Sequence, residues 1–216
     1  MTNVERVATA GGRHSGVVID SSFVIRHSSF TTRSAFTLIE LIVVFALILV
    51  LTGLVLSTAG YARKKGARAR AETEIAAMSA ACESYKADNA IYPRNSGSSD
   101  SLDAQMSGDP TTYQAASLYL YKQLSGDTNA NFQPPAGARS YFTFKPQMLE
   151  GPRDANGNLT GVSYIKDPFG NSYGYSTIQA ATLDTTKGYN PTFDLWSTAG
   201  TTTGSPTDRN QWIKNW

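Results

Sequence analysis

The chain has 216 residues, of which 41% are hydrophobic and 17% are charged, and its formal net charge is +2. This length allows one ordinary domain with an extended element and excludes two full domains with separate large cores. The positive excess comes from residues 1–35, which hold four arginines and two acidic residues, so the rest is neutral and nucleic acid is not an expected partner. Cys82 is the only cysteine, which excludes an internal disulfide.

Residues 1–35 are rich in Ser, Thr, Gly and Arg and show no sustained helical or strand period. A secretory signal peptide would place an apolar stretch of about 7 to 15 residues before its cleavage point. Here the apolar stretch follows residue 35 and is longer. We expect residues 1–35 to be a leader that is cleaved off, which leaves the apolar stretch in the mature protein.

Residues 36–59 form that apolar stretch, FTLIELIVVFALILVLTGLVLSTA, in which Glu40 is the one charged residue. At about 1.5 Å per residue a helix of this length measures about 36 Å, enough to cross a bilayer. We expect a transmembrane helix, for which the resemblance described below implies a second role in polymerisation. An ordinary signal anchor would show the same run, so hydropathy leaves that alternative open.

More basic residues lie just after the apolar stretch than just before it, where Arg33 and Arg26 are the nearest. Read literally, the positive-inside rule would place the C-terminal side of the helix in the cytoplasm. That rule is weakest for long translocated domains, and the motif described below indicates the opposite orientation. The basic residues after the stretch are Arg63, Lys64, Lys65, Arg68 and Arg70.

Residues 60–93 continue the helix as an amphipathic segment. Apolar side chains recur at spacings of three, four and seven, which predicts one buried stripe, and Pro93 ends the pattern. The stripe consists of Ile75, Met78, Cys82, Tyr85 and Tyr92. Gly53, Gly60 and Gly66 interrupt the long helix, either as tolerated small residues or as points of local unwinding or bending.

We expect residues 94–216 to form a globular α+β region, which the resemblance described below implies to be extracytoplasmic. A polar loop at 94–112 precedes a short amphipathic helix at 113–124. Short aromatic and β-branched runs at 140–149, 161–167, 171–178 and 193–198 predict an antiparallel sheet, with a type I turn from Asp167 to Gly170. The fold class is therefore α+β, a long N-terminal helix packed on a small antiparallel sheet, with the C-terminal tryptophans closing the core.

Glu40 stands near the start of the apolar stretch, within Arg33-Ser34-Ala35-Phe36-Thr37-Leu38-Ile39-Glu40-Leu41. A carboxylate costs about 2.5–3.5 kcal/mol at the centre of a membrane helix and less toward its edge, so a cationic partner is expected. If the chain is cut between Ala35 and Phe36, the new α-amino group lies one helical turn from Glu40. Glu40 would then neutralise this amine, or that of a neighbouring subunit.

This stretch resembles the type III signal of prepilins and of type II secretion pseudopilins, in which a basic leader and a small residue precede Phe-Thr-Leu-Ile-Glu-Leu. The resemblance implies a pilin-like fold, cleavage between Ala35 and Phe36, N-methylation of Phe36, and a role for Glu40 in subunit assembly. The family usually has Gly at the position of Ala35 and often a shorter leader. Further blocks similar to major pseudopilins occupy 85–93, 166–173, 193–197 and 212–216, whereas 94–163 do not align.

The resemblance implies a structural subunit of a type II secretion pseudopilus that supports protein export. Implied partners are other copies of the chain, minor pseudopilins, prepilin peptidase, the inner-membrane assembly platform and membrane lipid. Before assembly it would be a single-pass inner-membrane protein with a periplasmic C-terminal domain, and the filament would lie in the periplasm. A type IV pilin is one alternative. Many such pilins close a C-terminal loop with a disulfide, which a chain with a single cysteine cannot form, so the pseudopilin is favoured.

A membrane-anchored extracytoplasmic binding domain that does not polymerise is the other alternative. Enzyme chemistry is not expected, because both histidines, His14 and His27, lie in the leader and no phosphate-binding glycine loop is present. In major pseudopilins a loop that corresponds to 197–208 binds calcium, which implies Ser197 and Asp208 as ligands here. Only Asp208 is acidic in this loop, so a hydrogen-bonded Thr-rich loop without metal is the other reading.

Overall fold

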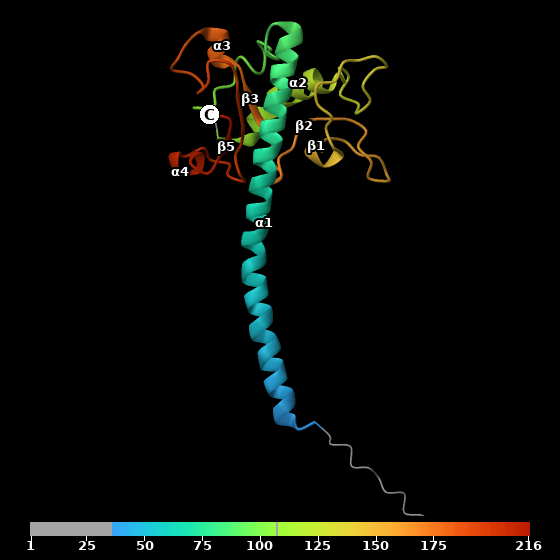
Figure 1. The fold of residues 1–216 in the computed structure, drawn as a ribbon, viewed down its shortest axis with the longest axis vertical. Coiled ribbons are helices and arrows are strands. Elements are labelled where there is room, and N and C mark those ends of the chain that lie inside the picture. The colour runs from blue at the N-terminus through green and yellow to red at the C-terminus, as the bar shows by residue number, and fades with distance from the viewer. Residues whose placement is uncertain (1–35, 107) are drawn as a thin grey trace, which may run out of the picture. The chain divides into compact units, whose positions relative to one another are not determined.

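The computed structural model describes residues 36–106 and 108–216 (Figure 1). The expected leader, residues 1–35, lies outside the described residues. The chain divides into two compact units, 1–48 and 49–216. Helix α1 begins in the first unit at Leu38 and ends in the second at Asn89. Its first part is rich in Leu, Ile and Val, and its second part is rich in Ala, Glu, Lys and Arg, which favour helix.

Helix α1 ends three residues before Tyr92, where the predicted helical pattern stopped. Ala90 adopts a left-handed backbone with a φ of 63°, and its N–H donates to the carbonyl of Lys86 at 2.8 Å. The side chain of Asn89 donates to the carbonyl of Tyr85 at 2.9 Å. The helix is therefore ended by a left-handed residue and a side-chain hydrogen bond, and Pro93 comes only after this turn.

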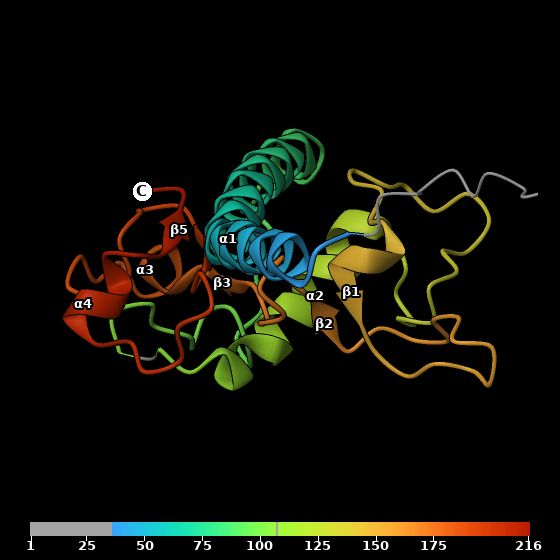
Figure 2. The ribbon, with the colours of Figure 1, turned by 90° about the horizontal axis from the view of Figure 1, so that it is seen from below.

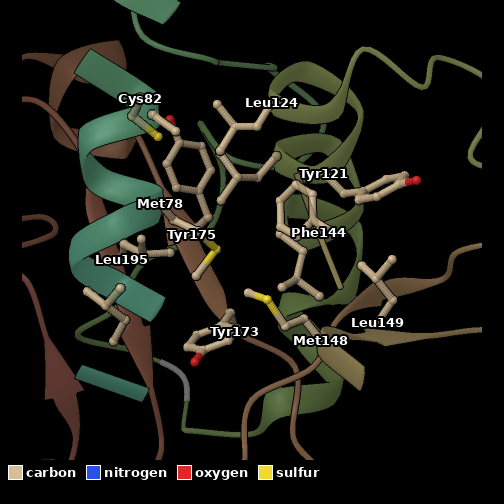
Figure 3. Packing of buried hydrophobic residues seen from close by; sticks show 14 of the residues in the cluster. Met78, Cys82, Tyr121, Leu124, Phe144, Met148, Leu149, Tyr173, Tyr175 and Leu195 are labelled. Carbon is tan, nitrogen blue, oxygen red and sulfur yellow. The ribbon is translucent and has the colours of Figure 1, made fainter. Parts of the chain in front are cut away.

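The predicted apolar stripe of α1 is confirmed. Ile75, Met78 and Cys82 are buried, and Tyr85 and Tyr92 pack against the same core in partly buried positions. Figure 3 shows Met78 and Cys82 pointing from α1 into the core toward Tyr175 and Leu124. Burial of this stripe holds the second part of α1 on the globular region.

The short helix predicted at 113–124 is present as α2, Gln114–Ser125, preceded by the 3₁₀ turn η1, Pro110–Tyr113. Asp109 begins this pair of elements, because its carboxylate accepts the N–H of Thr111 at 2.9 Å. Gly126 ends it with a left-handed φ of 76°. Leu120, Tyr121 and Leu124 face the core from α2.

The strands of the described residues form two small antiparallel sheets rather than the single sheet predicted. One pairs β1, Leu149–Glu150, with β2, Tyr164–Ile165. The other has the order β3-β4-β5, with β3 at Gly174–Ser176, β4 at Asp194–Ser197 and β5 at Ile213–Lys214. Within 49–216, Figures 1 and 2 show α2, β1 and β2 on one side of α1 and β5, α3 and α4 on the other.

The strand predicted at 140–149 is wrong except for its last residue. The N–H groups of Tyr141 and Phe142 both donate to the carbonyl of Leu124, at 2.7 and 3.0 Å, so they cap the end of α2 instead of pairing with a strand. Pro146 then opens the 3₁₀ turn η2, Pro146–Met148. The aromatic side chains of this segment still enter the core, as Phe144 does.

The predicted turn from Asp167 to Gly170 is confirmed, because the N–H of Gly170 donates to the carbonyl of Asp167 at 3.0 Å. Two further short helices follow it, α3 at Ile178–Thr182 and α4 at Pro206–Arg209. Both join the strands of the three-stranded sheet.

The C-terminal segment closes an aromatic cluster over the three-stranded sheet. Trp196 of β4 is fully buried, and its ring stacks on that of Trp212 at 6.0 Å between centroids. Tyr113 meets Trp196 edge-on at 5.0 Å, and Trp216 stacks on Tyr189 at 4.4 Å. This packing agrees with the predicted role of the C-terminal tryptophans in closing the core.

A first prediction concerns Gly174, which lies opposite Trp196 in the sheet. A Cβ at this position would come within 2.1 Å of the Trp196 ring, which the surrounding cluster holds in place. Gly174→Ala should therefore lower the free energy of unfolding by about 1–3 kcal/mol, as overpacking does in other cores. Thermal unfolding of the detergent-solubilised full chain, followed by near-UV circular dichroism, measures the change.

Gly66→Ala is the matched control, because a Cβ on Gly66 would meet nothing within 4 Å. Alanine is the better helix former by about 1 kcal/mol, so this variant should be as stable as the wild type or more stable. Equal midpoints for Gly174→Ala and the wild type would show that glycine is not required beside Trp196.

Candidate functional site

The first turn of α1 is held by a reciprocal pair of side chains, Thr37 and Glu40. One carboxylate oxygen of Glu40, Oε2, accepts the backbone N–H of Thr37 at 2.9 Å and its hydroxyl at 2.8 Å. In return the N–H of Glu40 donates to the Thr37 hydroxyl at 3.3 Å. This arrangement is a capping box, and it satisfies backbone donors that the first turn of a helix leaves without partners.

The capping box leaves the second oxygen of Glu40 available. Among the described residues, no donor is within hydrogen-bond distance of Oε1, and the side chain is exposed. The surface around it is apolar, with Phe36, Ile39 and Val43 beside Glu40 in an open depression of about 270 Å³. One carboxylate therefore caps its own helix through one oxygen, while its other oxygen lies at an exposed apolar surface.

Of the predicted processing residues, the structure describes Phe36 and not Ala35, which lies outside the described residues. Phe36 is 81% exposed and immediately precedes the capping residue Thr37. The structure thus places Phe36 and Glu40 side by side at the start of α1, in the same surface depression.

Within 36–106 and 108–216, nothing covers the apolar part of α1. Every residue from Phe36 to Ser57 is exposed, including large side chains such as Leu38, Phe45 and Leu56. Within the described part of the chain, α1 is the one helix that is long and apolar enough to cross a membrane. Gly53, Gly60 and Gly66 keep their helical conformation in it, so the helix is continuous through all three positions.

The two residues predicted to hold calcium have different partners. Ser197, at the end of β4, is buried, and its hydroxyl donates to Oδ2 of Asp167 at 2.5 Å. Asp208 accepts the hydroxyl of Thr203, and its N–H donates to the hydroxyl of Ser205 at 3.2 Å, which caps α4. The structure does not bring the Ser197 hydroxyl and the Asp208 carboxylate together.

The donor set does not fit a calcium ion, which takes six to eight oxygens that usually include several carboxylates. Within 36–106 and 108–216, no three His, Cys, Asp or Glu side chains gather in a position to hold a metal. The loop itself is joined by hydrogen bonds from the Thr201 hydroxyl to the Thr198 carbonyl at 2.8 Å and from Trp212 Nε1 to the Thr201 hydroxyl at 3.2 Å. This geometry favours the alternative of a hydrogen-bonded Thr-rich loop.

Two polar positions of the core were not predicted from the sequence. Glu74 lies on the buried face of α1, where its carboxylate accepts the hydroxyl of Tyr173 at 2.7 Å and Nε of Arg70 at 2.7 Å. Its place between buried Ala71 and Met78 was the available signal. The sequence predicts Asp167 as a turn residue, but no sequence pattern predicts its burial against Ser197.

Cys82 is buried on α1, and burial raises the pKa of its thiol well above the ordinary value. A thiol held in its neutral form in an apolar core is a poor nucleophile. Cys82 therefore acts as a small apolar residue in the stripe, as the sequence indicated.

Comparisons of the chain with protein-family models, with curated proteins and with solved structures give no match.

A second prediction concerns Asp167, whose pKa is raised by burial, although hydrogen bonds from Ser197, Asn171 and Phe169 act in the opposite direction. A carboxyl group with a raised pKa holds its proton more tightly in the folded state. It therefore favours folding at acid pH, and this contribution is lost as pH rises through the folded-state pKa. Asp167→Asn carries no charge at any pH, so its stability relative to wild type should increase from acid to neutral pH.

At acid pH the variant and the wild type should agree within about 1 kcal/mol, because asparagine resembles a protonated carboxyl group. Urea unfolding of both proteins across this pH range measures the difference. Asp184→Asn serves as a control of opposite sign, since hydrogen bonds from Thr186 lower the pKa of Asp184. A stability difference for Asp167→Asn that does not change with pH would contradict the prediction.

Proposed function

We propose that the chain is a structural subunit of a type II secretion pseudopilus, with a pilin-like fold, that assembles through the first part of α1 to support protein export. The observation that carries this proposal is the exposed apolar surface of α1 from Leu38 to Leu56, with one carboxylate, Glu40, at its beginning. The similarity of residues 33–41 to the prepilin signal supports the same assignment.

The exposed apolar surface requires a covering, because contiguous apolar area of this size is rarely left in water. Lipid covers it while the protein is a single-pass inner-membrane protein with its C-terminal domain in the periplasm. The corresponding helices of neighbouring copies cover it in a periplasmic filament. Lipid tails and apolar side chains are equally apolar, so hydrophobicity alone provides little drive from one environment to the other.

Polar pairing can therefore decide between the two environments, and Glu40 is the group that supplies it. After cleavage, the new α-amino group of Phe36 in one subunit is a cation, and the free oxygen Oε1 of Glu40 in the next is its acceptor. A charged pair in an apolar surrounding requires close geometry, and a charge left alone there is strongly unfavourable. The pair thereby fixes the axial position of each added subunit.

Processing follows from the same assignment. Prepilin peptidase cleaves between Ala35 and Phe36 and methylates the amine of Phe36, and the leader of residues 1–35 is removed. Minor pseudopilins and the inner-membrane assembly platform are the further partners in this proposal, which includes no enzymatic activity and no nucleic-acid binding.

A third prediction tests processing. Expression of the full-length chain with prepilin peptidase should give a protein that begins at Phe36 and carries one added methyl group, whereas expression without the enzyme should leave the leader in place. Intact-protein and peptide mass spectrometry measure both. A cut beyond the apolar stretch, or no cut at all, would exclude the pseudopilin assignment and favour a secreted domain or a membrane anchor.

A fourth prediction separates the charge of Glu40 from its capping role. Glu40→Gln retains an amide oxygen that can accept from Thr37, as Gln does in other capping boxes, but it lacks the charge. It should be processed and inserted like wild type, yet it should lose most filament assembly. Electron microscopy of sheared filaments and cysteine cross-linking between neighbouring subunits measure this.

Thr37→Val is the matched control, because it removes the capping hydroxyl and retains the charge of Glu40. Loss of this cap costs about 0.5–2 kcal/mol in helix stability, so assembly should be reduced but present. Normal filaments from Glu40→Gln would indicate that the charge is not needed. The alternatives of a type IV pilin and of an anchored binding domain then separate by whether copies of the chain polymerise at all.

A further inference from the structure

The buried stripe of α1 changes its chemistry at Arg68. On the C-terminal side of Arg68 the positions of the stripe are apolar and buried, as at Ala71, Ile75 and Met78. Continuing toward the N-terminus at the same spacing of three and four residues, the positions become Arg68, Lys64 and Tyr61. Residues at this spacing lie on one face of a helix. The face that packs on the globular region from Ala71 onward is therefore basic and exposed from Tyr61 to Arg68.

This basic face forms one wall of a groove of about 580 Å³ in the unit 49–216. On the helix it is lined by Tyr61, Lys64, Lys65 and Arg68, and on the opposite wall by Phe169, Ala199, Gly200 and Gln211. No carboxylate is among these lining residues. The groove therefore combines positive charge on one wall with apolar and backbone surface on the other.

Arg68 is held in place, whereas the two lysines are available. Arg68 Nη1 donates to the carbonyl of Gln211 at 2.7 Å, which joins the two walls, and its Nε lies 3.3 Å from the Glu72 carboxylate. Within residues 36–106 and 108–216, Lys64 and Lys65 form no ion pair. Two unpaired ammonium groups beside a fixed guanidinium attract an anion of high charge density, and a phosphate group is such an anion.

The position of the groove along α1 identifies the source of that phosphate. Lys64 and Lys65 follow the end of the apolar stretch at residue 59 by about 8–9 Å of helix. The polar headgroup layer on each side of a bilayer is about 5–8 Å thick, and lysine side chains extend along a helix to reach it. Tyr61, at the near end of the groove, lies where aromatic residues are enriched at membrane interfaces.

We infer that this groove binds the phosphate headgroup of an anionic phospholipid, an inference that rests on the membrane-spanning role of α1 in the proposed function. Lys64 and Lys65 bind the phosphate, while Phe169 and Gly200 contact the less polar glycerol part of the lipid. The inference also gives the basic residues after the apolar stretch a role other than orienting the helix, because their positive charge then binds a lipid phosphate.

Native mass spectrometry of the full-length chain tests the inference in mixed micelles that contain equal amounts of phosphatidylglycerol and phosphatidylcholine. The wild type should retain one phosphatidylglycerol in preference to phosphatidylcholine. Lys64→Gln/Lys65→Gln should lower that preference by about tenfold or more, since it removes the charged hydrogen bonds that the two lysines make to the phosphate. Arg63→Gln is the matched control, because Arg63 has the same charge at the same height on α1 but does not line the groove.

Several outcomes would overturn the inference. An equal loss of preference in Arg63→Gln and in Lys65→Gln would indicate a diffuse basic surface in place of a site. Displacement of the lipid by an equal concentration of inorganic phosphate would assign the groove to a soluble anion. If carbonate extracts the wild type from membranes, the proposed function is contradicted as well. If the protein stays inserted but shows no lipid preference, only the lipid site is contradicted.

Discussion

One continuous helix must satisfy two environments, and the rest of the structure depends on how α1 does so. In a bilayer every backbone N–H and C=O has to be paired within the segment, which a helix achieves at all positions except its ends. The Thr37–Glu40 capping box provides that pairing at the first turn of α1. Farther along, the same helix exchanges exposed apolar residues for a buried stripe that includes Ile75 and Met78. The change occurs without a break in its hydrogen bonding.

The parts of the fold that were predictable are those governed by a single local period. The buried stripe of α1 follows from helical spacing, and the turn at Asp167 follows from the preferences of Asp, Pro and Gly. The segment at 140–149 has the composition of a strand, but its backbone donors at Tyr141 and Phe142 bind the end of a helix that is distant in sequence. Such a choice of partner depends on tertiary structure, which composition does not contain.

At the candidate site, some features can be found in the sequence alone and others require the structure. The sequence singles out Glu40 through its cost in an apolar stretch, and the spacing Thr-x-x-Glu already contained the capping box that the structure shows. The pairing of Ser197 with Asp167 was not predictable, because it depends on β4 lying beside the turn at 167–170. The groove at Lys64 likewise requires Phe169 and Gly200 to be placed opposite α1.

The buried carboxylate of Glu74 has a consequence for where the globular region sits on the helix. Apolar positions spaced three and four residues apart repeat about every seven residues, so a seam of this kind alone would tolerate a shift of the helix by two turns. Such a shift would separate Glu74 from Tyr173, because Arg70 moves with Glu74 on the same helix and Tyr173 does not, and it would leave the buried Tyr173 hydroxyl without its acceptor. The bond therefore selects one axial alignment out of several, and it sets a fixed spacing of about 22 Å of helix between residue 59 and this bond.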